Sequence, residues 1–205
     1  PWLILEYVPL GRTAFRNYSD SGEKLALQQQ VTQNAFGWHR DNTIGASPQP
    51  NSTEQSWVMF WKKYRLGYQL ELAASHGYHG KVINRCEELI DRCDVLIDHK
   101  PSPSLLHGDL WSGNLSFDNA GVPVVYDPAV YYGDAEADLA MTELFGGFGT
   151  DFYHAYNDVS PIDSGYRTRK KLYNLYHILN HMNLFGGSYQ QQSLQMTEQL
   201  LSELK

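Results

Sequence analysis

The sequence predicts a mostly α-helical α+β fold, with a small β-hairpin at one edge of a single helical lobe. Apolar residues recur at helical intervals along most of the chain. Two strand-like runs, 114–117 and 122–126, are separated by the turn signal Asp118-Asn119-Ala120-Gly121. Hydrophobic residues make up 42% of the 205 residues, which is enough for one sizeable core.

Several helices are expected from the periodicity. Ser52 and Gln55 have the spacing of a capping box, and an aromatic stripe at helical intervals follows it: Trp57, Phe60, Trp61, Tyr64 and Tyr68. We expect this stripe to pack in the core, and a wall of a sugar site is the alternative. Further helices are expected over residues 82–97, 134–145, 166–185 and 188–204.

The loop entered by the short apolar run 104–106 is the most informative part of the chain. Residues 107–114 read HGDLWSGN, so that Asn114 follows Asp109 by five positions, and Asp127 follows Asn114 by 13. In protein kinases an Asp accepts the substrate hydroxyl proton, an Asn five residues later holds one Mg²⁺, and a second Asp beyond a hairpin holds another. The spacing predicts Asp109 as general base, Asn114 and Asp127 as Mg²⁺ ligands, and ATP as cofactor. The structural alternative is a strand end with an Asx turn, followed by a hairpin.

Two differences from the protein-kinase pattern concern the acceptor. The metal tripeptide is Asp127-Pro128-Ala129, and the fixed φ of proline disfavours regulation by a flip of this segment. Trp111 stands where a Ser/Thr kinase has a lysine, and no Ala-Pro-Glu segment follows. A small-molecule acceptor is therefore expected, with Trp111 in its wall. The alternative for Trp111 is a packing residue beneath the loop.

These motifs, together with a set of flanking ones, resemble the fructosamine kinase (ketosamine-3-kinase) family of the aminoglycoside-phosphotransferase-like, protein-kinase-like superfamily. The flanking matches are Phe36-Gly37-Trp38, Asp41-Asn42-Thr43-Ile44-Gly45, Gln49-Pro50-Asn51, Tyr132-Gly133-Asp134 and Leu184-Phe185-Gly186-Gly187. The resemblance implies ATP-dependent phosphorylation of a sugar hydroxyl of a ketosamine, such as a fructosamine or ribulosamine adduct on an amine or a protein lysine. The alternatives are a phosphotransferase for another small alcohol, aminoglycoside- or choline-like, and a non-catalytic kinase-like binding module.

The resemblance also assigns supporting residues. Asp138 is expected to hold the backbone of the catalytic loop, as the corresponding Asp does in the kinase fold, and His107 is expected to fix the same loop by hydrogen bonds. Asp41 and Asn42 lie in a loop that the family pattern places on the acceptor side, so they are predicted substrate contacts, with ordinary turn chemistry as the alternative.

The N-terminal segment resembles a kinase hinge. Leu5 would lie at the back of an adenine pocket, and the Glu6 carbonyl and the Val8 N–H would pair with adenine; an edge strand is the alternative. In a kinase the Gly-rich loop and its lysine precede the hinge. We therefore expect a hinge segment over residues 1–11 and a kinase-like C-lobe over 12–205. The N-lobe is expected to be absent, and the 205 residues alone to bind nucleotide weakly and turn over negligibly.

Composition excludes several classes of partner. The net charge is −7 and there is no broad basic stripe, which argues against nucleic acid, and no run of 18 apolar residues predicts a membrane span. One basic cluster, Arg167, Arg169, Lys170 and Lys171, is expected to be a solvated helix face rather than an anion site. Cys86 and Cys93 lie too far apart on one predicted helix for a disulfide, which favours a reducing, cytoplasmic location. The histidines show no metal-site spacing.

Overall fold

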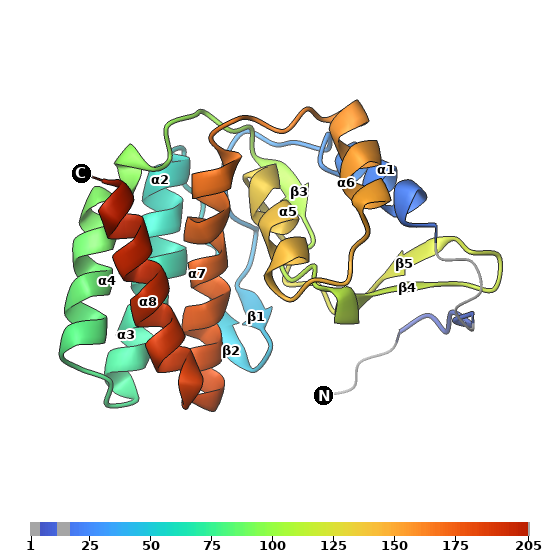
Figure 1. Cartoon of the computed structure of the whole chain (residues 1–205). Coiled ribbons are helices and arrows are strands. Elements are labelled where there is room, and N and C mark those ends of the chain that lie inside the picture. The colour runs from blue at the N-terminus through green and yellow to red at the C-terminus, as the bar shows by residue number, and fades with distance from the viewer. Residues whose placement is uncertain (1–4, 12–16, 205) are drawn as a thin grey trace.

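In the computed structural model, which describes residues 5–11 and 17–204, a layer of helices is accompanied by three two-stranded antiparallel sheets, one of which projects at the edge of the molecule (Figure 1). The elements, in chain order, are α1 (Tyr18–Gln28), β1 (Asn42–Ile44), β2 (Ser47–Gln49), α2 (Trp57–Phe60), the π-helix η1 (Trp61–Gly67), α3 (Tyr68–Ser75), α4 (Lys81–Arg92), the 3₁₀ turn η2 (Cys93–Val95), β3 (Ser104–Leu106), the 3₁₀ turn η3 (Ser112–Asn114), β4 (Leu115–Phe117), β5 (Pro123–Val125), β6 (Tyr131–Gly133), α5 (Ala135–Leu144), α6 (Thr150–Val159), α7 (Tyr166–Phe185) and α8 (Ser188–Glu203). The predicted class, α-rich with small sheets, is confirmed.

The long helix α7 lies at the centre of the helical layer. It packs against α3, α5, α8 and η1, while α1 packs against α6 at the other end of the molecule (Figure 1). The helices predicted over 134–145, 166–185 and 188–204 are confirmed as α5, α7 and α8 within one residue at each end. The run 82–97 forms α4 followed by η2, and Cys86 and Cys93 are both buried and free.

The start of α2 corrects one prediction. The helix begins at Trp57 with Ser56 as its N-cap, whose side chain accepts the N–H of Met59. The capping box at Ser52 and Gln55 is wrong because this segment is extended: the backbones of Glu54 and Phe36 exchange two hydrogen bonds, of 2.9 and 3.0 Å. Core packing of the aromatic stripe is confirmed for its buried members, Trp57, Phe60 and Trp61. The π-helix that follows was not predicted.

The predicted hairpin is confirmed as β4 and β5, in which Leu115 pairs with Val125. Its turn is held by Asp118, whose Oδ1 accepts the N–H groups of Ala120 and Val122, each at 2.8 Å. A second hairpin, β1 and β2, was missed, since residues 41–43 read as turn chemistry but form a strand start. The third sheet pairs β3 with β6 and was also not predicted as a pair.

The predicted hinge begins outside the described residues, which start at Leu5. Residues 5–9 form no strand, and Leu5 and Tyr7 are 69% and 87% exposed. Gly11 N–H then donates to Phe117 O at 2.8 Å, so the segment runs beside β4. The division into residues 1–11 and 12–205 stays a prediction, because residues 12–16 are also outside the described part. Among the described helices, none has the length and apolar character needed to cross a bilayer.

Candidate active site

The β4–β5 hairpin brings the predicted metal ligands together at one end. Asn114 immediately precedes β4, and Tyr126 immediately follows β5. Because Leu115 pairs with Val125, Tyr126 N–H donates to Asn114 O at 3.2 Å, and Asp127 is the next residue. A separation of 13 residues in sequence therefore becomes adjacency in space. This adjacency is what the spacing argument required.

Asp109 and Asn114 contact each other directly. The Asn114 amide Nδ2 donates to the main-chain oxygen of Asp109 at 2.9 Å and to its carboxylate Oδ2 at 3.3 Å. An amide has one nitrogen and one oxygen, so this contact leaves the Asn114 Oδ1 as the acceptor side of the group. Asn114 is buried, which fixes this orientation.

The catalytic loop is held from behind by Asp138 on α5. Its Oδ2 accepts His107 N–H at 2.7 Å, and its Oδ1 accepts Gly108 N–H at 2.8 Å. His107 Nε2 lies 2.9 Å from Tyr126 O, which can only accept, and His107 Nδ1 accepts Asp109 N–H at 3.3 Å. The ring is therefore the neutral Nε2–H tautomer, and burial lowers its pKa in agreement. The predicted loop-holding roles of Asp138 and His107 are confirmed.

Glycine is required at position 108. Its φ is +82°, and a Cβ added there would lie 2.1 Å from Ala129 O. The predicted catalytic loop, residues 107–114, and the predicted metal segment, residues 127–130, thus approach closely. The Ala129 N–H donates to His107 O at 2.9 Å. A side chain at this position would push the two segments apart.

The electrostatics of the site favour a proton acceptor near neutral pH. Burial, together with the charges of Asp138 and Asp127, raises the pKa of Asp109 to about 6, while the Asn114 hydrogen bond opposes this rise. A general base whose pKa lies close to the working pH combines availability with driving force.

The donor set fits a hard divalent cation. Asp127 is exposed and Asn114 Oδ1 is the free side of a fixed amide, so both offer oxygen ligands of the kind Mg²⁺ takes. Asp127 has φ of +54°, a left-handed conformation that Asp tolerates better than most residues. The two residues would hold Mg²⁺ next to Asp109.

Trp111 lies at the surface of the loop rather than beneath it. It is 39% exposed and makes an edge-to-face contact with Phe145 at 6.2 Å between ring centroids. A Cβ at Gly113 would lie 2.2 Å from the Trp111 ring, so the ring covers that glycine. Its role in the acceptor wall stays a prediction.

The hydrogen bonds of the other predicted site residues do not involve Asp109. Asn42 uses its whole amide internally: Nδ2 donates to Val130 O at 2.8 Å, and Oδ1 accepts from Gln49 and Asn51. Asp41 is exposed, and its Oδ1 accepts the Asn51 N–H at 2.7 Å. In the described part of the chain the Glu6 carbonyl and the Val8 N–H make no hydrogen bond.

Comparison with known proteins decides the family. The family model described as fructosamine kinase matches residues 1–203. The chain belongs to the fructosamine kinase family. It is 50% identical to a probable ketoamine kinase from Synechocystis, over 98% of this chain and 68% of that protein. It is 41% identical to the chloroplastic protein-ribulosamine 3-kinase of Arabidopsis thaliana, over 100% of this chain and 63% of that protein.

Solved structures agree with this membership. A protein from Thermobifida fusca that is assigned as a fructosamine-3-kinase superposes with a TM-score of 0.89 at 32% identity, covering 96% of this chain and 69% of that one. The choline kinase LicA of Streptococcus pneumoniae superposes at 0.58 with 15% identity, which shows a shared fold alone. The Synechocystis and Arabidopsis relatives align along 98% and 100% of this chain. The alignments lend no support to the expectation that an N-lobe is absent.

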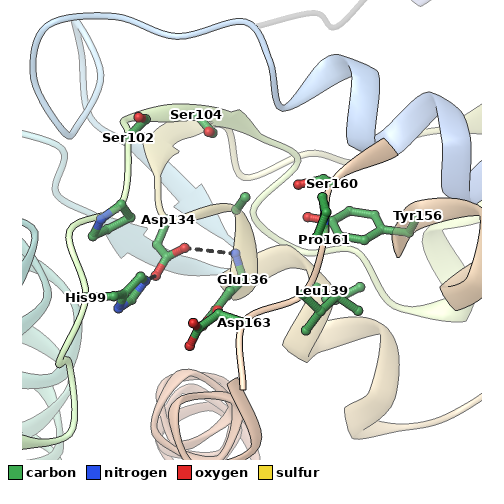
Figure 2. Close-up of a pocket in the computed structure, with 13 residues that line it drawn as sticks. His99, Ser102, Ser104, Asp134, Glu136, Leu139, Tyr156, Ser160, Pro161 and Asp163 are labelled. Atoms are coloured by element: carbon green, nitrogen blue, oxygen red, sulfur yellow. Dashed lines mark hydrogen bonds and ion pairs between the residues drawn. The ribbon is translucent and has the colours of Figure 1, made fainter. Parts of the chain in front are cut away.

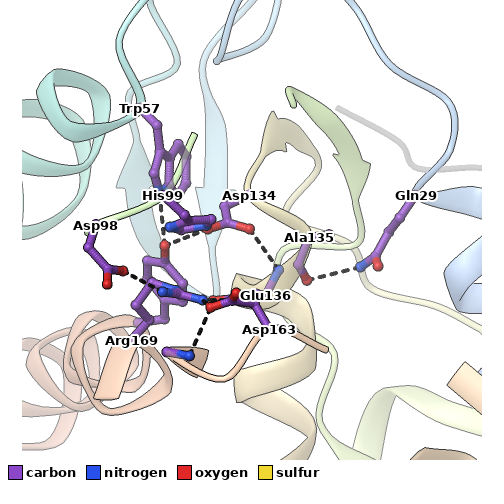
Figure 3. Close-up of polar contacts among 11 residues, drawn as sticks. Gln29, Trp57, Asp98, His99, Asp134, Ala135, Glu136, Asp163 and Arg169 are labelled. Atoms are coloured by element: carbon purple, nitrogen blue, oxygen red, sulfur yellow. Dashed lines mark hydrogen bonds and ion pairs between the residues drawn. The ribbon is translucent and has the colours of Figure 1, made fainter. Parts of the chain in front are cut away.

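A second polar centre of this family member lies at the N-terminus of α5 (Figures 2 and 3). His99, Asp134 and Glu136 bring ligand-type atoms within 4.8 Å of one another beside a cavity of about 220 Å³. Arg169 already neutralises one member of this group, since it makes two hydrogen bonds to Glu136, of 2.7 and 2.8 Å. Asp134 accepts from His99, from Tyr173 and from the Glu136 N–H. The centre is an ion-pair cluster rather than a vacant metal site.

Arg169 also corrects the prediction for the basic cluster. It is 1% exposed and pairs with Asp98, Glu136 and Asp163, so it does not lie on a solvated face. Lys170 and Lys171 are partly exposed and pair with Glu143 and Glu203. The prediction failed because two of these three partners, Asp98 and Glu136, are distant in sequence, and a basic run by itself does not reveal them.

Sequence reasoning missed the side chains behind the metal segment. Gln49 and Asn51 appeared only as part of the family pattern, and Arg65 was not singled out. All three are buried, and they contact Asn42 or one another. A signal was present, because three amide side chains within ten residues must find partners if the hairpin that carries them is covered.

Proposed function

We propose that the protein transfers the γ-phosphoryl group of ATP to a sugar hydroxyl of a ketosamine, free or attached to a protein lysine. The kinase part of the proposal is carried by one observation: Asn114 donates to Asp109 while the hairpin sets Asn114 beside Asp127. The acceptor class is supported by the names of the relatives, a ketoamine kinase and a ribulosamine 3-kinase.

In this proposal Asp109 orients the acceptor hydroxyl and takes its proton as the oxygen attacks. The buried carboxylate, with a pKa raised to about 6, is ionised at neutral pH and still basic enough to accept a proton. Asn114 and Asp127 hold Mg²⁺. When bound, Mg-ATP supplies the phosphoryl group and the positive charge that neutralises the developing negative charge. Asp138 and His107 keep the loop backbone fixed, so little reorganisation is needed at the moment of transfer.

The adenine side of the site is proposed from the N-terminal segment. The Glu6 carbonyl and the Val8 N–H have no hydrogen-bond partner within the described residues, so both can pair with a base edge. Val8 is half-buried, and Leu5 offers an exposed apolar side chain for the ring. Whether the 205 residues by themselves bind nucleotide weakly and turn over negligibly stays a prediction, which a calorimetric titration with Mg-ATP tests.

On the acceptor side, Trp111 and Asp41 are the exposed candidates for contact with the sugar. Asn42 stays a predicted contact, although its amide is already engaged. A phosphotransferase for another small alcohol is the competing proposal, and an acceptor panel of a fructosyl amine, a ribulosyl amine, an aminoglycoside and choline separates the two. A cytoplasmic location is proposed from the two free, buried cysteines and is tested by cell fractionation.

Asp109→Asn tests the chemistry. Removing a positioned base is expected to lower kcat by a factor of about 10²–10⁴, while Mg-ATP affinity stays close to that of the wild type. In the wild type kcat/KM is expected to fall as the pH drops through about 6, because Asp109 becomes protonated. Asp158→Asn, at an exposed carboxylate on α6, is the control and should change neither quantity. Unchanged phosphorylation by Asp109→Asn would remove Asp109 from the mechanism, whereas no phosphorylation of any acceptor by the wild type would favour a binding module.

A further inference from the structure

Arg65 is a completely buried cation without a carboxylate partner in the described part of the chain. It is 0% exposed, lies in the π-helix η1, and takes part in no ion pair there. An arginine side chain is a cation with five N–H donors, and a buried charge is normally paired. π-Helical segments inside helices are frequent at functional sites. An unpaired charge in such a segment needs an explanation.

Carbonyl oxygens and aromatic rings stand in for the missing counter-ion. One terminal nitrogen donates to Pro50 O and Tyr64 O, at 2.8 and 2.9 Å, and the other donates to Asn51 Oδ1 at 2.8 Å. Three rings lie around the guanidinium carbon, namely Tyr131 at 3.9 Å, Phe60 at 4.6 Å and Tyr176 at 5.7 Å from their centroids. The Arg65 Nε has no hydrogen-bond partner among the residues that the structure describes.

A series of hydrogen bonds leads from Arg65 through Asn51 and Asn42 to the main chain at Val130. Asn51 Nδ2 donates to Asn42 Oδ1 at 2.9 Å, and Asn42 Nδ2 donates to Val130 O at 2.8 Å. The two ends of this series of hydrogen bonds fix the direction of every donor and acceptor in it, because a guanidinium can only donate and a main-chain carbonyl can only accept. The orientation of both amides is thus determined by chemistry, and a reversed Asn51 would place an N–H group against Arg65.

A second branch reaches the neighbouring carbonyl. Gln49 Nε2 donates to Ala129 O at 3.0 Å and to Asn42 Oδ1 at 2.8 Å. Its Oε1 accepts the hydroxyl of Tyr176 at 2.7 Å, and the Tyr176 ring is one of the three beside Arg65. Two consecutive main-chain carbonyls, Ala129 and Val130, are therefore each held by a buried or half-buried side-chain amide.

These carbonyls follow directly after the proposed metal ligand. Asp127 is in the left-handed region with φ of +54°, and such a conformation in a non-glycine residue persists only where the surroundings determine it. Pro128 cannot contribute an N–H to hold the segment. Tyr126 fixes the segment before Asp127, and the carbonyls at 129 and 130, with the Ala129 N–H bonded to His107 O, are the fixed points after it.

We propose that Arg65 is a positioning residue which, through Asn51, Asn42 and Gln49, holds segment 127–130 so that the Asp127 carboxylate keeps its place for the metal. The proposal rests on the proposed function, since it takes Asp127 as a ligand. It gives Asn42 a role in positioning the metal segment in addition to its predicted acceptor contact.

The test compares two half-buried amides in the protein. Asn42→Ala removes the donor to Val130 O, and Asn183→Ala is the matched control. Asn183 is also half-buried and donates to a main-chain carbonyl at 2.9 Å and to a side-chain oxygen at 2.8 Å, but both belong to Gln69. Mn²⁺ binding in the presence of ATP is measured by electron paramagnetic resonance, and thermal unfolding is measured in parallel.

Asn42→Ala is expected to weaken Mn²⁺ binding about tenfold, the lower range for loss of a residue that supports a metal ligand, and Asn183→Ala to leave it within about twofold. Equal Mn²⁺ affinities in the two variants, with similar losses in melting temperature, would overturn the proposal and leave Asn42 a structural residue. In an Asp127→Asn background, Asn42→Ala should have no further effect on Mn²⁺ binding.

Arg65→Met and Arg65→Lys extend the test to the start of the chain of contacts. Methionine removes the charge, and lysine keeps it but loses the planar fork that holds Asn51. Both are expected to weaken Mn²⁺ binding, and Asn42→Ala decides the proposal if neither folds. Asp127→Asn distinguishes a failure of the proposed metal site from a failure of the positioning role. If it leaves Mn²⁺ binding intact, the proposed role of Asp127 as a metal ligand fails. If it abolishes binding while Asn42→Ala has no effect, only the positioning role fails.

Discussion

Among the described residues, Arg65 and Arg169 are the two arginines that the fold buries almost completely, and their surroundings differ in charge. Arg169 is 1% exposed and contacts three carboxylates, of which Glu136 is itself only 12% exposed (Figure 3). Arg65 is 0% exposed and contacts carbonyl oxygens and aromatic rings. One region compensates its cation with charge, and the other does so with dipoles and ring faces.

The difference follows from what each region holds. Arg169 fixes Glu136 in the first turn of α5, and two residues further along the same helix Asp138 binds the backbone of the catalytic loop. Arg65 is linked through amides to the metal segment. A carboxylate beside Arg65 would pair with it directly and take the place of Asn51 Oδ1. The series of hydrogen bonds through the amides therefore forms only because no carboxylate lies there.

The largest expected effect is on stability, when each arginine is replaced by methionine. Arg169→Met should lower the free energy of unfolding by about 3–5 kcal/mol, because Glu136 is left as a buried, unpaired carboxylate. Arg65→Met should lower the free energy of unfolding by only about 1–3 kcal/mol, since it leaves carbonyl acceptors rather than a charge without a partner. Urea unfolding at pH 7 measures both.

A double variant checks the cause. Adding Glu136→Gln to Arg169→Met removes the stranded charge and should recover part of the loss, whereas the single change in Arg65 has no carboxylate to remove. Equal losses in the two methionine variants would mean that the ion pairs around Arg169 contribute no more than ordinary hydrogen bonds, and the contrast between the regions would not hold.

The catalytic loop and its hairpin could be predicted from the sequence because their information is local. Asp109, Asn114 and Asp127 lie within 19 consecutive residues, and a two-stranded hairpin joins the parts. Helices α5, α7 and α8 were predicted because their apolar residues repeat over ten or more positions. Local periodicity and turn chemistry are sufficient where the partners are near in sequence.

The two arginine regions could not be predicted for the opposite reason. Arg169 pairs with Glu136 and Asp98, which lie 33 and 71 positions away, and nothing in a run of basic residues distinguishes its buried member. The environment of Arg65 depends on Tyr131 and Tyr176 arriving from other elements. The capping box failed in the same way, because pairing between Glu54 and Phe36 outweighed a local helix signal.

Asp109 extends the comparison to carboxylates and gives an intermediate effect. Unlike Glu136, it has a proposed catalytic role and no cationic partner within the described residues, and burial raises its pKa from 3.8 to about 6. Because folding favours the protonated form, this contribution to stability is fully present below the unfolded pKa and is lost as the pH rises through about 6. Asp109→Asn is therefore expected to be more stable than the wild type at pH 8, by about 1–2 kcal/mol after allowing for partial exposure.

Urea unfolding between pH 4 and pH 8 measures this difference. The gain should shrink as the pH falls below about 6 and be absent near pH 4, where the wild-type carboxyl is protonated in the folded state. Asp158→Asn, at an exposed position, is the control and should show no such pH dependence. A constant difference at all pH values would show that amide packing, and not the buried charge, causes it.

The smallest effect concerns His99, which contacts Asp134 at 2.7 Å beside the Arg169 cluster. Burial lowers the pKa of His99, but the hydrogen bond and charge of Asp134 outweigh it and raise the pKa above its ordinary value. The resulting stabilisation is fully present below the unfolded pKa, which is near 6.5, and is lost as the pH rises through the folded value.

His99→Gln should therefore lower stability by about 0.5 kcal/mol at pH 5.5 and by less at pH 9, with exposed His154→Gln as the control. Differential scanning calorimetry at the two pH values measures the change. A pH-dependent loss means that the cluster holds a second cation besides Arg169, so that charge compensation is general in this region. A loss of the same size at both pH values means that His99 acts as a neutral donor, and that Arg169 alone balances the carboxylates.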